Sequence, residues 1–138
     1  MIEYLLDTNT VIAFAGKKSA EVVRRLDRTS PGTVGVCSIV AHELYFGAYK
    51  SQRLEHNLET LRLLFADFVV VDFDREDART AGEIRASLAR TGKPIGPLDV
   101  LIAGQAKRRG ATLVTNNLGE FRRVEDLRLE DWTEAWRT

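Results

Sequence analysis

Apolar and polar positions along the chain fall into two alternating patterns. Short, almost wholly apolar runs occupy residues 4–6, 34–37, 68–71 and 111–114, and none alternates strictly between polar and apolar side chains. Strands that are covered on both faces have this pattern, because every side chain meets a packing partner. The sequence therefore predicts four buried strands.

Segments with a helical period lie between these runs. They cover residues 11–14, 20–28, 39–50, 54–65, 77–90 and 99–109, and a Gly- and Pro-containing stretch, 92–97, separates the last two. Strands that alternate with helices predict an α/β domain with a parallel sheet, in which functional residues gather at the carboxyl ends of the strands. Because we find no repeat and no linker, we expect residues 1–138 to form a single domain.

Charge and composition exclude several functional classes. The 138 residues carry 20 Lys and Arg and 20 Asp and Glu, for a net charge of +0. This balance excludes a uniformly basic nucleic-acid wrapper but allows a local basic patch. The longest stretch without a charged side chain, residues 29–42, is shorter than the roughly 18–20 residues that a membrane span needs. With one cysteine, Cys37, and no signal-like start, the sequence predicts a soluble cytoplasmic protein.

Three acidic residues occupy unusually apolar settings. Asp7 ends the first strand, Glu43 has apolar neighbours three and four positions away, and Asp99 opens the last predicted helix. Each also has an ordinary explanation, since Asp7 and Asp99 can stabilise helix N-termini and Glu43 can pair with a distant arginine. Other acids, Asp77 among them, have charged neighbours, and we expect them on solvated, ion-paired faces.

The three acids carry more weight together, because a strand end and two helix starts can converge at one edge of a parallel sheet. Clustered carboxylates repel and raise one another's pKa, and a divalent cation removes that penalty. Mg²⁺ prefers carboxylate oxygens, whereas His42 and His56 lack the partner spacing of a zinc site. The sequence thus predicts a metal site at Asp7, Glu43 and Asp99.

A polar cluster follows the last predicted strand, at Thr115, Asn116 and Asn117. Such side chains could position water or complete a metal shell. A turn is the simpler explanation, because Asn tolerates left-handed backbone conformations.

Five ordered pieces of the sequence carry a family resemblance. They are Leu6-Asp7-Thr8-Asn9, Ser38 with Glu43, Gly96-Pro97-Leu98-Asp99, Ile102 to Ala106, and Val114 to Asn117 with Glu120-Phe121; Leu127 and Trp132 match the usual tail. In this order they resemble the PIN-domain family, specifically the VapC-type toxins of bacterial toxin–antitoxin pairs, over roughly residues 2–132. The resemblance implies a central parallel sheet of four to five strands flanked by helices, and a ribonuclease that depends on Mg²⁺ or Mn²⁺.

The resemblance also implies roles for particular residues. Asp7 and Asp99 look like metal ligands, and Glu43 looks like a ligand, directly or through water, that also accepts a proton from the nucleophile. Asn117 stands where many family members have a fourth acid, and Glu120, about one helical turn on, would compensate for it. Supporting polar side chains would be Asn9, Ser38, Thr115 and Asn116. The Gly-Pro-Leu-Asp and Thr-Asn-Asn forms look most like the branch that cleaves initiator tRNA(fMet) in its anticodon loop.

Substrate and partners are expected to use other surfaces. Candidate RNA-binding side chains are Lys17, Lys18, Arg24, Arg25, Lys107, Arg108, Arg109, Arg122 and Arg123. The resemblance implies an inhibitory VapB-type antitoxin, and we expect one of its arginines to enter the carboxylate pocket while an apolar segment docks on helices 39–50 and 54–65. We further expect a homodimer, a heterotetramer or larger assembly with the antitoxin, DNA contact only through the antitoxin, and no membrane association.

Two alternatives stay open at this point. Residues 7–11 approach the D-x-D-x-T/V start of haloacid-dehalogenase-like phosphatases, although Asn9 replaces the second Asp. An inactive PIN-like module that only binds a partner protein is the other alternative, and Asn117 is the residue that favours it.

Overall fold

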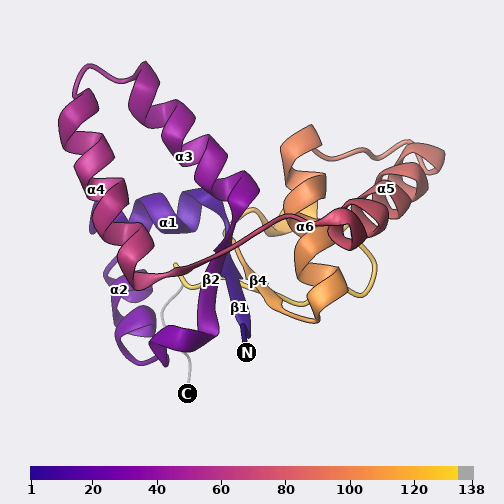
Figure 1. Ribbon diagram of the computed structural model, residues 1–138. Coiled ribbons are helices and arrows are strands. Elements are labelled where there is room, and N and C mark those ends of the chain that lie inside the picture. The colour runs from indigo at the N-terminus through magenta and orange to yellow at the C-terminus, as the bar shows by residue number, and fades with distance from the viewer. Residues whose placement is uncertain (134–138) are drawn as a thin grey trace.

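A computed structural model describes residues 1–133 and shows a five-stranded parallel sheet surrounded by helices (Figure 1). The strands are β1 (Tyr4–Leu6), β2 (Val34–Cys37), β3 (Val69–Val71), β4 (Thr112–Val114) and β5 (Leu129–Glu130), in the spatial order β3-β2-β1-β4-β5. All four predicted strands are present. Phe68 ends the preceding helix rather than opening β3, and Ala111 precedes β4. The two-residue β5 lies outside the predicted runs.

The helices follow the predicted pattern with small shifts at their ends. They are α1 (Thr8–Ala15), α2 (Ala20–Asp27), α3 (Ser38–Lys50), α4 (Leu54–Asp67), α5 (Arg75–Arg90), α6 (Pro97–Arg109) and the short α7 (Leu118–Phe121), with a 3-10 turn at Pro31–Thr33. Helix α1 begins earlier than predicted because Asp7 caps it, and α5 does so because Asp74 and Asp77 form a capping box. No helix within residues 1–133 is long and apolar enough to cross a membrane.

The order of the strands reverses its direction at one place in the sheet, between β1 and β4. From β1 the chain winds outward through β2 to β3, and it then crosses to β4 on the other side of β1. The winding direction therefore reverses between β1 and β4, and α/β proteins bind ligands outside the carboxyl ends of strands at such a point. Asp7 follows β1 and Thr115 follows β4 at this edge of the sheet. In Figure 1 the central strands lie between the α3–α4 hairpin and the α5–α6 pair.

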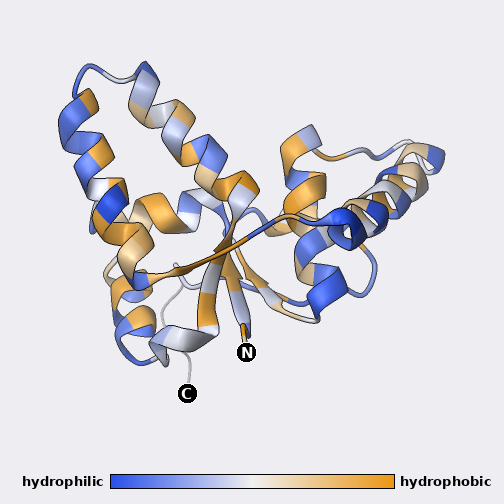
Figure 2. Ribbon diagram, viewed as in Figure 1, coloured by the Kyte–Doolittle hydropathy of each residue, from blue (hydrophilic) through white to orange (hydrophobic). Residues whose placement is uncertain are grey.

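The core covers the central strands on both faces, as the continuous apolar runs predicted. The prediction that residues 68–71 form a buried strand is wrong, because β3 lies at the edge of the sheet and its Val69 and Val70 are 45% and 36% exposed. Leu5, Leu6, Val36 and Leu113 are at most 1% exposed, and Figure 2 shows the central strands as largely hydrophobic against the hydrophilic outer surface of α5. Cys37 is also buried, and its Sγ accepts a hydrogen bond from the Ile39 amide at the start of α3.

Helices α5 and α6 pack backbone against backbone. A Cβ atom placed on Gly104 of α6 would lie 2.6 Å from the Cβ of Ala81 and 2.8 Å from its Cα and N atoms. Real Cβ atoms do not approach other heavy atoms so closely. Glycine at position 104 therefore allows the two helices to come into direct contact.

Asp77 also joins these two helices, and the prediction that it lies on a solvated face is wrong. Its side chain is fully buried, and it accepts hydrogen bonds from Gln105, Arg108 and Arg109 of α6. Burial alone would raise the pKa of Asp77, but the hydrogen bonds from Arg109, Gln105, the Asp74 capping box and Arg108 lower that pKa to about 2. Since α6 carries Asp99 at its other end, this cluster fixes the helix that presents a candidate site residue.

Candidate active site

Asp7 is buried at the end of β1 and fixes the start of α1. Its Oδ1 accepts a hydrogen bond of 2.9 Å from the Thr10 amide, and the Thr10 hydroxyl donates to the Val114 carbonyl of β4 at 3.1 Å. The capping explanation for Asp7 is thus confirmed. Capping uses one carboxylate oxygen, so it is compatible with the predicted ligand role of Asp7, which stays a prediction.

Glu43 is half-buried on α3 and is held by a residue that the sequence analysis missed. The Thr8 hydroxyl donates a 2.9 Å hydrogen bond to the Oε1 of Glu43. This bond joins the first residue of α1 to the middle of α3, across 35 positions of sequence. Thr8 belongs to the Leu6-Asp7-Thr8-Asn9 piece of the family resemblance, but the sequence analysis gave it no role of its own.

Asp99 and Glu120 approach each other at Gly96. The Gly96 amide donates to the Oε1 of Glu120 at 2.6 Å, and the Asn117 side chain donates to its Oε2 at 2.5 Å. A Cβ atom on Gly96 would lie 3.1 Å from the Oδ2 of Asp99 and 3.6 Å from the Oε1 of Glu120. A larger residue at position 96 would therefore press on the Asp99 carboxylate and contact that of Glu120.

The electrostatics link four carboxylates rather than three. Burial and the negative charges of Glu120, Glu43 and Asp7 raise the pKa of Asp99 to about 6. The pKa of Glu120 is instead lowered, first by the hydrogen bond from the Gly96 amide and also by the one from Asn117. Asp99 is therefore the more readily protonated of the two, because two N–H donors stabilise the charged form of Glu120.

This donor set fits a hard divalent cation in its chemistry. The side chains that act on Asp99 are all carboxylates, and their mutual repulsion is the penalty that such a cation removes. Within residues 1–133, however, no three His, Cys, Asp or Glu side chains are placed so that together they could hold a metal ion. The described residues therefore contain no preformed three-acid metal site, although the carboxylates of Asp7, Glu43 and Glu120 act electrostatically on Asp99.

The predicted supporting residues separate into two groups. Thr115 is fully buried and its hydroxyl accepts a 2.9 Å hydrogen bond from the Asn117 amide, so it shapes the turn that delivers Asn117. The hydroxyl of Ser38 accepts from the Phe73 amide at 3.0 Å, which ties α3 to the segment after β3. Asn9 and Asn116 are exposed at the same edge of the sheet.

Most of the predicted RNA-binding arginines have intramolecular partners. Arg24 pairs with Glu21, Arg25 pairs with Glu130 and stacks on Trp132, and Arg108 and Arg109 both pair with Asp74 and Asp77. Arg123 donates to the Pro94 carbonyl at 3.0 Å. Lys17, Lys18 and Arg122 are exposed, and Lys107 is half-buried.

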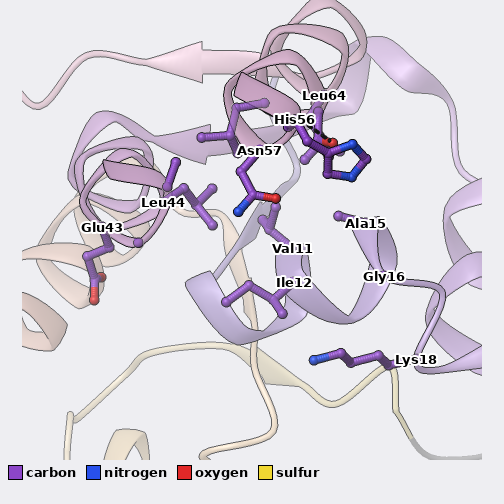
Figure 3. Close-up of a pocket in the computed structure, with 14 residues that line it drawn as sticks. Val11, Ile12, Ala15, Gly16, Lys18, Glu43, Leu44, His56, Asn57 and Leu64 are labelled. Atoms are coloured by element: carbon purple, nitrogen blue, oxygen red, sulfur yellow. Dashed lines mark hydrogen bonds between the residues drawn. The ribbon is translucent and has the colours of Figure 1, made fainter. Parts of the chain in front are cut away.

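An apolar groove runs beside the carboxylates, between α1, α3 and α4 (Figure 3). Its volume is about 480 Å³, and Val11, Ile12, Leu44 and Leu64 line it, with Glu43 at one end. Leu61, which the sequence assigned to a docking surface, also lines the groove, whereas Tyr45 and Tyr49 are exposed on α3 outside it.

Comparison with known proteins decides the family. A family model described as PIN domain matches residues 4–127. A protein of Shigella flexneri named tRNA(fMet)-specific endonuclease VapC is 43% identical over 133 residues, which are 96% of this chain and 100% of that protein. The chain belongs to the VapC branch of the PIN-domain family. The predicted resemblance is thus confirmed, and the haloacid-dehalogenase-like phosphatase is excluded.

Solved structures agree with this assignment. The PIN domain superposes on a DNA-bound VapBC from Salmonella typhimurium with a TM-score of 0.91 and 41% identity, covering 96% of this chain and 99% of that one. For VapBC2 from Rickettsia felis, bound to a DNA fragment from its promoter, the TM-score is 0.89 and the identity 36%, with the same coverage. The predicted α/β fold with a parallel sheet of four to five strands is therefore confirmed.

Proposed function

We propose that this PIN domain is a Mg²⁺-dependent endoribonuclease, with Mn²⁺ as a substitute, that cleaves initiator tRNA(fMet) in its anticodon loop. The observation that carries the proposal is the coupling of Asp99 to Glu120, Glu43 and Asp7 at the switch point of the sheet. The Shigella flexneri relative, named a tRNA(fMet)-specific endonuclease, supports the choice of substrate.

Asp7, Asp99 and Glu43 are the residues that would hold the cation. When bound, the cation would lower the pKa of a water nucleophile and offset the charge that develops on the phosphorus oxygens. The Thr10 amide fixes the Asp7 carboxylate and the Thr8 hydroxyl fixes Glu43. Glu43 then accepts the proton of the attacking water, since its second oxygen is not needed for the bond to Thr8.

Glu120 supplies the fourth negative charge that Asn117 cannot. Asn117 orients Glu120 through their side-chain hydrogen bond, and the Gly96 amide keeps Glu120 ionised. Burial and the neighbouring carboxylates raise the pKa of Asp99 to about 6, so without metal it is protonated below that pH, and a bound cation would favour its ionised form.

A cleavage assay tests the proposed function. Purified protein is incubated with initiator tRNA and with an elongator tRNA of similar length, in Mg²⁺ and in EDTA. We expect cleavage of initiator tRNA alone, only in Mg²⁺, and none by Asp7→Asn. Asn is the matched replacement because its side-chain oxygen preserves the cap on α1. Absence of any metal-dependent cleavage by folded wild-type protein would instead favour the inactive binding module.

Such a ribonuclease needs an inhibitor, and we infer a VapB-type antitoxin. The solved VapBC complexes support this partner, and the apolar groove beside Glu43 is a surface on which a segment of it would dock. An antitoxin arginine would extend from there to Asp7, Glu43 and Asp99. Charge-reversal scanning of antitoxin arginines tests this, since one Arg→Glu change should restore RNA cleavage.

We propose the same assembly state that the sequence suggested. The PIN domain forms a homodimer in the cytoplasm, where tRNA is found, and joins the antitoxin in a heterotetramer or larger complex. DNA is contacted only by the antitoxin in this arrangement. Light scattering of the toxin alone and of the complex, with and without promoter DNA, distinguishes these states.

A further inference from the structure

A second pocket, separate from the apolar groove, lies between the end of α5 and α7. Its volume is about 520 Å³, and it is lined by Leu88, Thr91, Lys93, Gly119, Arg122 and Arg123. Three of these six residues are cationic and none is acidic. In a chain whose net charge is zero, this is a local concentration of positive charge, and we call it the basic pocket.

The basic pocket borders the candidate active site directly. Gly119 lines the pocket and the next residue, Glu120, belongs to the carboxylate cluster. Residues 93–96 connect the two sites, because Arg123 donates to the Pro94 carbonyl and the Gly96 amide donates to Glu120. A strand that places one phosphate at the carboxylates would therefore have its neighbouring phosphates within reach of the pocket.

The side chains of this pocket are also available to a ligand. Among residues 1–133, neither Lys93 nor Arg122 forms an ion pair, and both are exposed. Arg108 and Arg109, by contrast, are neutralised by Asp74 and Asp77. A cation without an internal partner releases counterions when it meets a phosphate, and this release is the main source of sequence-independent affinity for RNA.

We propose that the basic pocket binds the RNA backbone next to the cleaved phosphate and so sets the register of the strand at the carboxylates. Arg122 and Lys93 bind phosphate oxygens, and the guanidinium of Arg122 can do so with two parallel hydrogen bonds. Arg123 is a positioning residue, since its bond to Pro94 holds the segment that ends at Gly96. The inference rests on the proposed function, because it assumes that RNA is the substrate.

Binding of RNA to protein that cannot cleave it tests the pocket without requiring catalysis. A fluorescein-labelled RNA stem-loop with the anticodon loop of initiator tRNA is titrated by anisotropy with Asp7→Asn protein in EDTA, at several salt concentrations. The comparison adds Lys93→Ala with Arg122→Ala. We expect affinity to fall by roughly fivefold or more, and the slope of log affinity against log salt to decrease by about 1.4, because two phosphate contacts are lost.

A matched control removes two other positive charges, with Arg28→Ala and Arg53→Ala. Both are exposed arginines, and they lie at the end of α2 and just before α4, away from α5 and α6 (Figure 1). This control should leave affinity and slope unchanged. In otherwise wild-type protein with Mg²⁺, the pocket variant should raise KM for the stem-loop with little change in kcat.

Three outcomes overturn the inference. The first is an unchanged salt slope in the pocket variant, and the second is an equal loss in the control. The third is unchanged RNA binding with weaker binding of the antitoxin, which would assign the pocket to a protein partner. If wild-type protein cleaves no RNA, the proposed function fails, whereas these binding measurements still decide whether the pocket holds RNA.

Discussion

Gly104→Ala should destabilise the protein although alanine is the better helix former. The added Cβ would lie 2.6 Å from the Cβ of Ala81 and 2.8 Å from its backbone atoms, which cannot rotate away. Forcing such overpacking costs about 3 kcal/mol at the upper end of the usual range. Helix propensity returns about 1 kcal/mol. The net loss of about 2 kcal/mol corresponds to a fall in Tm of roughly 6 °C for a domain of this size.

The matched control is Gly82→Ala on α5. An added Cβ there meets nothing within 4 Å, so the substitution should stabilise the protein. The gain is about 0.5–1 kcal/mol, and Tm should rise by a few degrees. Thermal melts followed by circular dichroism, together with urea titrations, compare the two variants. Gly→Ala is thus expected to lower the stability of the protein at position 104 of α6 and to raise it at position 82 of the adjacent helix α5.

A double variant locates the strain. Ala81→Gly removes the nearest opposing atom but leaves the backbone atoms of residue 81, and it costs about 1 kcal/mol of helix propensity by itself. Gly104→Ala should therefore lower Tm less in the Ala81→Gly background than in wild type. Because Gly104 and Asp99 share helix α6, RNA cleavage by Gly104→Ala should also fall at temperatures where the variant is fully folded. A Gly104→Ala protein as stable as wild type would refute the close contact between α5 and α6.

Three further variants test the charged groups. Asp77, with a pKa of about 2 against an ordinary 3.8, contributes about 2 kcal/mol that is complete above about pH 4 and is lost as the pH falls through 2. Urea titrations at several pH values should show this loss in the free energy of unfolding of wild type. Asp77→Asn should be less stable near neutral pH, and its free energy of unfolding should change less with pH. An equal pH dependence in the two proteins would contradict the role of the Asp77 charge. Asp99, whose pKa is raised to about 6, destabilises the metal-free fold increasingly as the pH rises through that value. Asp99→Asn should therefore melt higher than wild type in EDTA at neutral pH and gain less from Mg²⁺, and equal gains would remove Asp99 from the ligand set. Glu120→Gln keeps the acceptor for the Gly96 amide but loses the charge, so half-maximal cleavage should need several-fold more Mg²⁺. An unchanged Mg²⁺ requirement would show that Glu120 only orders the loop.

Strands and helix starts that depend on the local pattern of residues could be predicted from the sequence. The continuous apolar runs located the strands and identified β1, β2 and β4 as buried, whereas the same pattern in β3 belongs to an edge strand with two exposed valines. Asp7 and Asp99 were recognisable because each stands at the start of a helix. The two-residue β5 and four-residue α7 lacked enough positions to show any period. The presence of β5 depends on its pairing with β4 rather than on its own residues.

Contacts between residues far apart in the chain could not be predicted from the sequence. Asp77 has charged neighbours in sequence and looked solvated, but Arg108 and Arg109, 31 and 32 positions away, allow it to be buried. The site shows the same limit, since the Gly96 amide that keeps Glu120 charged lies 24 positions before it. Local settings identified the acids, and only the fold shows that the pKa of Asp99 is raised while that of Glu120 is lowered.

The burial of Cys37 has a practical consequence for labelling. Burial raises the pKa of this thiol to about 11, so it stays protonated near neutral pH and closed to alkylating reagents. It is also the single cysteine of the chain. A cysteine introduced on the surface, for instance by Gly82→Cys on α5, would therefore be the one thiol that maleimide dyes modify. Fluorescent reporters can be attached to the native sequence without first replacing the cysteine that caps α3.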